Sequence, residues 1–212
     1  MDNTNGSRIP HILLALYGVF FAILAFAPFD RMTWFVENAT VWIIVGTLVA
    51  LWIKGVRFSV PSYLAMAVLV FLHTLGGHYT FERVPFDAVT EFFGFERNHY
   101  DRIAHFSVGF YAFPIAEWLW AKRLVATRFL LFTYPVFVIM SIAAAYELIE
   151  WIYAASSDPI AGANYLGSQG DIWDAQKDML ADTLGALVAT CAFFWWRGVR
   201  RLSADLDRSS HP

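Results

Sequence analysis

Long apolar runs, separated by short polar stretches, dominate the pattern of this chain. Six runs are long enough to cross the roughly 30 Å hydrocarbon core of a bilayer as helices. The pattern therefore predicts an all-α integral membrane protein with six transmembrane helices. Residues 11–200 are expected to form one membrane domain, and residues 1–10 and 201–212 its terminal tails. The runs cover about residues 11–29, 34–53, 61–77, 101–120, 129–153 and 178–196.

Proline and glycine positions refine these boundaries. Pro61 is well placed to open the third run, and Gly76 and Gly77 are a natural stop for it. Pro114 and Pro135 fall within the fourth and fifth runs. A proline there either kinks the helix or lies near one of its ends.

Only two connections are long, at about residues 78–100 and 154–177. In the first of them, acidic residues alternate with phenylalanines. That pattern suits an amphipathic segment, which either covers a site as a lid or lies on the outer leaflet.

Composition supports a membrane protein. Of the 212 residues, 58% are hydrophobic and only 16% are charged, whereas a soluble domain carries about 25% charged residues. The net charge of −3 gives no sign of nucleic-acid binding. Cys191 is the single cysteine, so an internal disulfide and a multi-cysteine zinc site are both excluded.

The distribution of basic residues predicts the orientation, because cytoplasmic loops are enriched in Lys and Arg. With both termini in the cytoplasm, ten basic residues lie inside and five outside, and the two long loops are extracytoplasmic. The inner set is Arg8, Lys54, Arg57, Lys122, Arg123, Arg128, Arg197, Arg200, Arg201 and Arg208. The outer set is Arg31, Arg83, Arg97, Arg102 and Lys177.

Ionisable residues gather at the outer ends of the last four spans. Placing a charged side chain at the edge of a membrane costs free energy unless a partner group lies at the same depth. Glu117, the one acid near the inner ends, is expected to pair with Lys122 or Arg123. The outer group consists of His73 and His78 in span three, Asp101, Arg102 and His105 in span four, Glu147 and Glu150 in span five, and Asp174, Asp178 and Asp182 in span six.

Spacing decides which of these side chains can act together. Asp101 and His105 are four residues apart and share a helix face, although such a pair also serves as a simple lock on a helix end. Asp174, Asp178 and Asp182 share a face if the last helix begins early. Acids in a first turn are favoured by the helix dipole, but this does not explain Asp182.

Several other candidate residues also have a purely structural interpretation. Glu147 could be structural, paired with Arg102 or Lys177. His73 and His78 are five residues apart and do not share a face, so they are weak as a metal pair, and His73 is more typical of a core histidine. His99 adjoins the amphipathic loop.

The combination predicts a bowl of carboxylates and imidazoles that holds a divalent metal or carries out acid–base chemistry. Mixed Asp, Glu and His ligands favour zinc, manganese or iron. Arg102 would bind an anionic part of the substrate. The expected ligands are Asp101, His105, Asp174 and Asp178, the expected catalytic groups are Glu147, Glu150 and Asp182, and the further candidates are His73, His78, His99 and Asp171.

Four separated motifs resemble the YjdF family of bacterial inner-membrane proteins: "HYTFERVPF", "NHYDRIAHFSVGF", "YELIEW" and "GDIWDAQKDMLADTLGAL". The resemblance covers roughly residues 60–195 and implies a multi-span helical fold in the inner membrane. The elements "DRIAHF" and "DMLADTLGAL" are also similar, more distantly, to the VanZ-like group of the cell envelope. That group has Asn where this chain has Asp182.

Three functions remain open at this point. The first is an enzyme that acts on a lipid or cell-envelope substrate at the outer leaflet. The second is a small ion- or metal-binding or transport protein, and the third is a structural membrane protein whose bowl is an ion-pair network. The lipid bilayer is the expected partner in all three.

Overall fold

The computed structural model describes residues 8–156 and 168–198, together with residues 159, 162, 166 and 202. Every regular element in this part of the chain is a helix, so the all-α prediction is confirmed. The elements are α1 (Ile9–Leu24), α2 (Arg31–Ile53), α3 (Val60–Tyr79), α4 (Asp87–Phe93), α5 (Tyr100–Val108), the 3₁₀ turn η2 (Gly109–Tyr111), α6 (Ala112–Ala121), α7 (Arg128–Ser156) and α9 (Asp174–Arg197).

Four of these helices, α2, α3, α7 and α9, are long and apolar enough to cross a membrane, and α1 is a shorter apolar helix. The expected fourth run is not one continuous helix. It is divided into α5, η2 and α6, and Pro114 is the third residue of α6. Pro114 thus lies near a helix end, whereas α7 continues through Pro135. The expected tail at residues 201–212 lies outside the described residues, apart from Leu202.

Local sequence sets the helix ends. The carboxylate of Asp30 caps α2 by accepting a hydrogen bond of 2.7 Å from the backbone N–H of Thr33. Ser59 caps α3. The expected stop at Gly76 and Gly77 is wrong, because α3 continues to Tyr79 and ends at Thr80 in a left-handed conformation.

The two glycines serve close packing instead of termination. A methyl group added at Gly76 would lie 2.3 Å from the ring of Phe81, and one at Gly77 would lie 3.1 Å from Cβ of Glu37. A side chain at Gly76 would therefore displace the ring of Phe81, whereas one at Gly77 would require Glu37 to shift by only a few tenths of an ångström.

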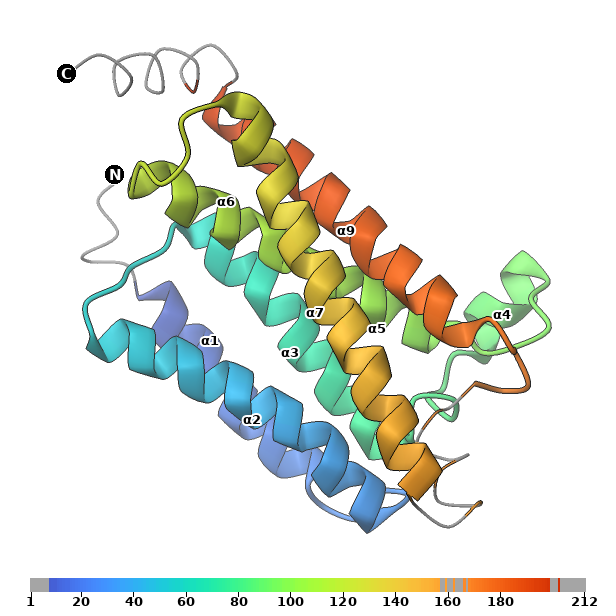
Figure 1. Cartoon of the computed structure of the whole chain (residues 1–212). Coiled ribbons are helices and arrows are strands. Elements are labelled where there is room, and N and C mark those ends of the chain that lie inside the picture. The colour runs from blue at the N-terminus through green and yellow to red at the C-terminus, as the bar shows by residue number, and fades with distance from the viewer. Residues whose placement is uncertain are drawn as a thin grey trace.

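The helices form two groups joined by α3 (Figure 1). On one side α1 and α2 pack on α3, around a core of Tyr17, Val41 and Val70. On the other side α5, α6 and α7 pack on α9, and the core includes Phe113 and Phe193. Since α2 packs mainly on α3 and α7 packs on α6 and α9, α2 and α7 face one another across the join.

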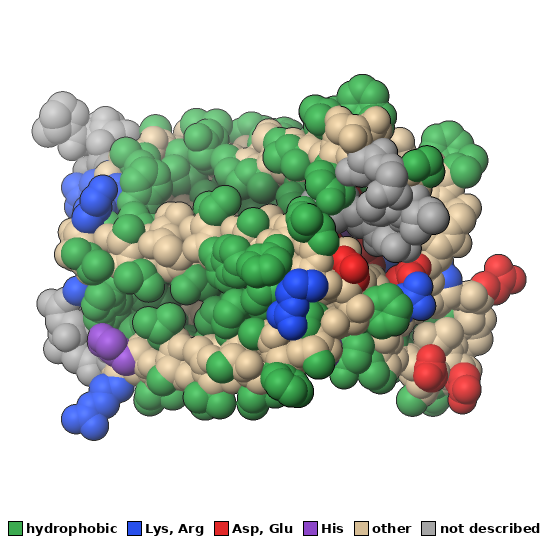
Figure 2. Space-filling view, turned by 90° about the horizontal axis from the view of Figure 1, so that it is seen from below, with side chains coloured by type: hydrophobic (Ala, Val, Ile, Leu, Met, Phe, Trp, Pro, Cys, Tyr) green, Lys and Arg blue, Asp and Glu red, His purple; other side chains and the backbone are tan. Residues whose placement is uncertain are grey.

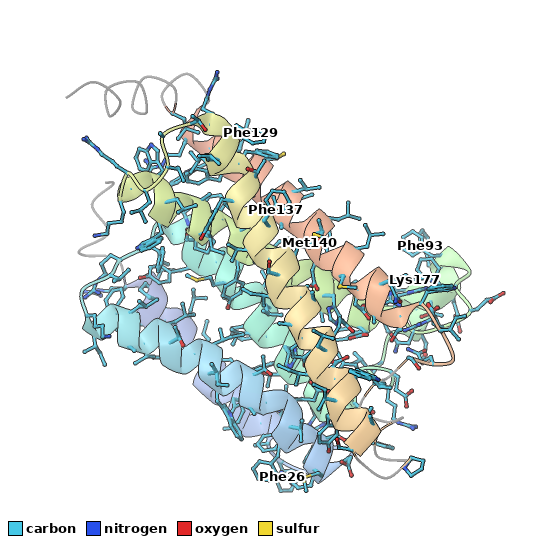
Figure 3. All side chains as sticks on the ribbon, viewed as in Figure 1. Phe26, Phe93, Phe129, Phe137, Met140 and Lys177 are labelled. Atoms are coloured by element: carbon cyan, nitrogen blue, oxygen red, sulfur yellow. The ribbon has the colours of Figure 1, made fainter. Side chains whose placement is uncertain are left out.

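The outer surface suits a bilayer. Figure 2 shows a broad hydrophobic band between one end with Lys and Arg and another end with Asp and Glu. On α7, Phe137 and Met140 are 63% and 48% exposed, and they lie along the middle of that helix (Figure 3). Lys177 on α9 and Phe93 on α4 lie toward the same end of the bundle (Figure 3).

The short helix α4 has no buried residue, and Phe92 is 82% exposed. Of the phenylalanines in the loop before α5, it is Phe81 that borders the cavity described below.

The expected pairing of Glu117 with Lys122 or Arg123 is wrong. Glu117 is buried on α6, and its carboxylate accepts hydrogen bonds from the backbone N–H and hydroxyl of Ser59 and from the hydroxyl of Ser62. Among the described residues, no basic side chain lies within ion-pair distance of it. Glu117 therefore ties α6 to the start of α3.

Candidate functional site: an Asp–His cluster beside a buried cavity

Two glycines bring the backbones of two helices into contact at the site. A methyl group added at Gly185 of α9 would lie 1.9 Å from the carbonyl oxygen of Phe106, and one at Gly109 would lie 2.2 Å from the backbone nitrogen of Ala186. Small residues allow membrane helices to approach this closely. His105 lies one turn before Gly109 and Asp182 one turn before Gly185, so the crossing sets these two side chains against each other.

His105 is the centre of the cluster. Its Nδ1 lies 3.3 Å from Oδ2 of Asp182, and its Nε2 lies 3.7 Å from Oδ1 of Asp101 and 3.8 Å from Oδ1 of Asp178. Asp182 is 1% exposed and Asp178 3% exposed. The imidazole therefore has carboxylates on both of its ring nitrogens.

Three of these side chains have the geometry of a candidate cation site. Asp101, His105 and Asp178 each offer one ligand atom, and these atoms all lie within 4.8 Å of one another. Asp182 occupies the other ring nitrogen of His105. This is the position of the carboxylate that orients a metal-bound histidine in many metalloproteins.

α9 begins at Asp174, four residues before the expected start of the last span, so the condition for Asp174, Asp178 and Asp182 to share a helix face is met. Asp174, Asp178 and Asp182 are all buried, as residues on one helix face that packs against α5 should be. Asp174 is not one of the three residues of the cation site, however; its carboxylate contacts Arg97 and Arg102.

An ion-pair cluster adjoins the cation site on the side of the loops that precede α5 and α9. Arg102 contacts Asp174 and Asp178 directly and lies 3.5 Å from Asp171, while Arg97 lies 2.9 Å from Asp174 and 3.4 Å from Asp171. With Lys177, 2.6 Å from Asp171, three basic groups match three acids. Because Arg102 is engaged by carboxylates, its role in binding an anionic substrate stays a prediction.

Asp171 belongs to this ion-pair cluster. The hydrogen bond from Lys177 and that from the backbone N–H of Trp173 lower the pKa of Asp171 below its ordinary value. Asp178 contacts both Arg102 and His105 through the same oxygen. A carboxylate has about four lone-pair positions, so it can serve an arginine and a cation together.

A cavity of about 110 Å³ adjoins the cluster. Asp101, His105 and Asp182 border it from α5 and α9, and Glu150 borders it from α7. The oxygen Oδ1 of Asp182 is buried and has no hydrogen-bond partner among the described residues. The cavity thus has an acidic wall with an unfilled hydrogen-bonding position.

The opposite wall contains a residue that the sequence analysis missed. Glu37 of α2 is 3% exposed and forms an ion pair of 3.2 Å with His73 of α3. The hydroxyl of Tyr146 donates a hydrogen bond of 3.5 Å to Glu37, which links α7 to α2 across the cavity. His73 thus borders the cavity as well as packing in the core. The pair Glu37-Asn38 within an apolar run was the signal that could have found this wall.

Glu147 and Glu150 have different surroundings. Glu150 borders the cavity. Glu147 does not border it, and its buried Oε1 has no hydrogen-bond partner in the described part of the chain. The alternative in which Glu147 pairs with Arg102 or Lys177 is wrong, because both of those side chains bind aspartates of the ion-pair cluster.

Two candidate histidines lie apart from the cavity. Nδ1 of His78 lies 2.7 Å from the carbonyl oxygen of Leu24, a contact between α3 and α1. His99 directly precedes α5, and its ring lies edge-on to Phe95. Burial lowers the pKa of His99, and the positive charges of Arg97 and Arg102 lower it further.

Comparison with known proteins decides the family. Residues 9–198 match the family model described as "Predicted membrane protein (DUF2238)". This chain belongs to the DUF2238 family. The DUF2238 chain is also similar to the inner membrane protein YjdF of Escherichia coli (strain K12), with 36% identity over 180 residues, which cover 81% of this chain and 83% of that protein. No solved structure matches it.

These matches confirm the resemblance to the YjdF family and the location of this DUF2238 protein in the inner membrane. The matched region, residues 9–198, contains all the residues of the Asp–His cluster and of the cavity. The more distant similarity to the VanZ-like group stays a prediction.

Proposed function

We propose that this DUF2238 protein crosses the inner membrane six times and carries an extracytoplasmic metal site. The six crossings would be α1, α2, α3, the broken unit α5–η2–α6, α7 and α9. Figure 1 supports this, because the start of α1 and the end of α9 lie at the same end of the bundle. The basic residues between α2 and α3 and between α6 and α7 lie at that end too, which makes it the cytoplasmic end.

The function that the geometry supports best is a metal-assisted enzyme that acts on a lipid or cell-envelope substrate. The observation that carries it is the convergence of Asp101, His105 and Asp178 within 4.8 Å, with Asp182 on the far nitrogen of the imidazole. Three protein ligands are typical of catalytic metal sites, which keep a further position for water or substrate. Structural sites are closed by a fourth protein ligand.

The protein groups around this position suit hydrolysis. A divalent metal held by Asp101, His105 and Asp178 would supply a water-derived nucleophile near neutral pH. Glu150 borders the same cavity, while Asp182 orients His105. Mixed carboxylate and imidazole ligands favour zinc, manganese or iron.

A site is favoured over an ion pathway through the membrane. The region between α2 and α6, beyond the cavity and toward the other end of the bundle, is lined almost entirely by apolar side chains. A transport route would require polar groups there, and Glu117 is sequestered by Ser59 and Ser62.

Elemental analysis tests the proposal. The protein is purified without chelator and without affinity-metal contact, beside His105→Ala and Asp178→Ala. Asp87→Ala is the matched control, because Asp87 is an exposed acid of α4 outside the cluster. We expect about one divalent metal per chain in the parent and the control, and loss of metal in both cluster variants. Metal-free parent protein that is folded and monodisperse would overturn the proposal.

A further inference from the structure

The charges around the cavity do not balance. Among the described residues, four carboxylates border it, from Glu37, Asp101, Glu150 and Asp182, and two imidazoles, from His73 and His105. Two negative charges therefore remain even if both histidines are protonated. Arg97, Arg102 and Lys177 do not supply the missing positive charge, since they are matched by Asp171, Asp174 and Asp178.

Each wall of the cavity carries two carboxylates and one imidazole, so a metal at the cation site would leave the excess of acid on the opposite wall. Glu150 makes no hydrogen bond or ion pair with another described residue, and the charges that act on it most are those of Glu37 and Glu147. With that metal in place, Glu150 and Glu37 still face the cavity, and the one imidazole on their wall is that of His73, which pairs with Glu37. This wall therefore favours a cationic group that can also donate hydrogen bonds.

An apolar groove continues from the cavity. The groove has a volume of about 460 Å³ and runs between α2 and the η2–α6 segment. Ile44 borders both the cavity and the groove, so the two meet at this side chain. Other groove residues are Leu48, Tyr111 and Ile115.

The groove opens on the side of the bundle. Two of its lining residues, Ile43 and Trp118, are 70% and 43% exposed. In a bilayer these side chains face lipid tails, and a chain in the groove would run along α2 toward the cytoplasmic end. The acidic cavity and the adjacent apolar groove match the two parts of a lipid. The cavity at the outer end suits a polar headgroup, and the groove below it suits a hydrocarbon chain.

We propose that the cavity and the groove together bind one lipid molecule with an amine-bearing headgroup. The ammonium group lies against Glu37 and Glu150, and one acyl chain lies in the groove past Ile44. The inference rests on the proposed function in taking the cavity as the substrate site, and the phosphate of such a lipid would face the cation site. The groove sets this occupant apart from a free metal ion or a small amine, neither of which would use the apolar volume.

Native mass spectrometry of the purified chain tests the inference. The probes are phosphatidylethanolamine and phosphatidylglycerol with identical acyl chains, added in equal amounts. We expect a preference of roughly tenfold or more for phosphatidylethanolamine, as a hydrogen bond to a charged partner gives. The preference is lost in Glu150→Gln and in Glu37→Gln. Because Glu150 has no partner to lose among the described residues, its variant stays informative if Glu37→Gln fails to fold.

The acyl chain has its own variants. Ile44→Trp narrows the junction between cavity and groove and should weaken binding of both lipids. Val188→Trp is the control, since Val188 is a 53% exposed residue of α9 that borders neither space. Equal binding of the two lipids, unchanged by all four substitutions, would show annular lipid only and would overturn the inference. A preference that survives both Gln variants would overturn the assigned headgroup contacts.

Repeating the measurement with chelator separates this inference from the metal site. A headgroup preference in protein that never contains metal supports the lipid site and overturns the metal site. Bound metal without any headgroup preference does the reverse.

Discussion

Gly109 and Gly185 place the η2 turn and α9 in backbone contact, and this crossing is what forms the site. The contact leaves no room for a methyl group, because Cβ at Gly185 would lie 1.9 Å from the carbonyl oxygen of Phe106. His105 and Asp182 are each one turn away from the contact. The 3.3 Å distance between their side chains therefore depends on two glycines, which have no reactive side chain.

Gly185→Ala should separate the two helices and damage the site. Overpacking of this kind costs about 1–3 kcal/mol, which thermal unfolding in detergent will measure, and metal content should fall with it. Gly46→Ala is the control, because nothing lies within 4 Å of a Cβ at Gly46 on α2. That variant should be neutral or gain about 0.5–1 kcal/mol from helix propensity. Equal stability of the two variants would refute the close crossing.

Asp182→Asn should weaken the metal site without removing a ligand. Loss of a carboxylate that orients a metal-bound histidine typically lowers metal affinity about 10–100-fold. Asp178→Asn removes a direct ligand and should have a larger effect. Competition titration with a chelator of known affinity measures both. If Asp182→Asn retains full affinity and full turnover of an identified substrate, the orienting role is wrong.

Glu117→Ala should destabilise the fold and leave the metal site intact. Its buried carboxylate accepts hydrogen bonds from Ser59 and Ser62. Loss of these hydrogen bonds lowers the free energy of unfolding by about 2–4 kcal/mol. Lys122→Ala, a nearby surface change, should stay within about 0.5 kcal/mol of the parent. Unfolding midpoints and metal content are measured on the same samples. If Glu117→Ala lost metal in proportion to its loss of stability, the independence of the Glu117 contacts and the metal site would be contradicted.

The cap of α2 should give a pH-dependent contribution to stability. The hydrogen bond from Thr33 lowers the pKa of Asp30, so the carboxylate stabilises the folded state above its unfolded pKa of about 4. That contribution is lost as pH falls through the lower folded-state pKa. Asp30→Ala should therefore cost about 1 kcal/mol at pH 7.

Unfolding midpoints measured from pH 7 down to pH 3 check this cap. The difference between the parent and Asp30→Ala should shrink below about pH 4. Asp30→Asn keeps a good cap and should be close to the parent at pH 7. A difference that stays constant down to pH 3 would mean that the charge of Asp30 does not contribute.

The sequence predicted the candidate site best where several of its residues lie on one helix. The four-residue spacing of Asp101 and His105, and of Asp174, Asp178 and Asp182, requires only a helical repeat, and both groups do converge. Glu37 was missed because its importance comes from α2 facing α7, a relationship that no local pattern encodes. The carboxylate partners of Arg102 were not predicted either, because they come from a segment some 70 residues away.

Helix ends were harder to predict for the same reason. Gly76 and Gly77 resemble a stop signal, but both are buried where α3 passes Phe81 and Glu37. The break at Gly109–Tyr111 divides a run that is apolar enough to be continuous. In both places tertiary packing, and not local propensity, determines where the backbone changes.

X-ray absorption spectroscopy at the edge of the bound metal tests the central claim most directly. The account predicts one imidazole nitrogen and carboxylate oxygens at about 2.0–2.2 Å if the metal is zinc. The imidazole scattering should disappear in His105→Ala and remain in His73→Ala. An imidazole signal that survives in His105→Ala, or its absence from the parent protein, would contradict the assignment of His105 as the central ligand.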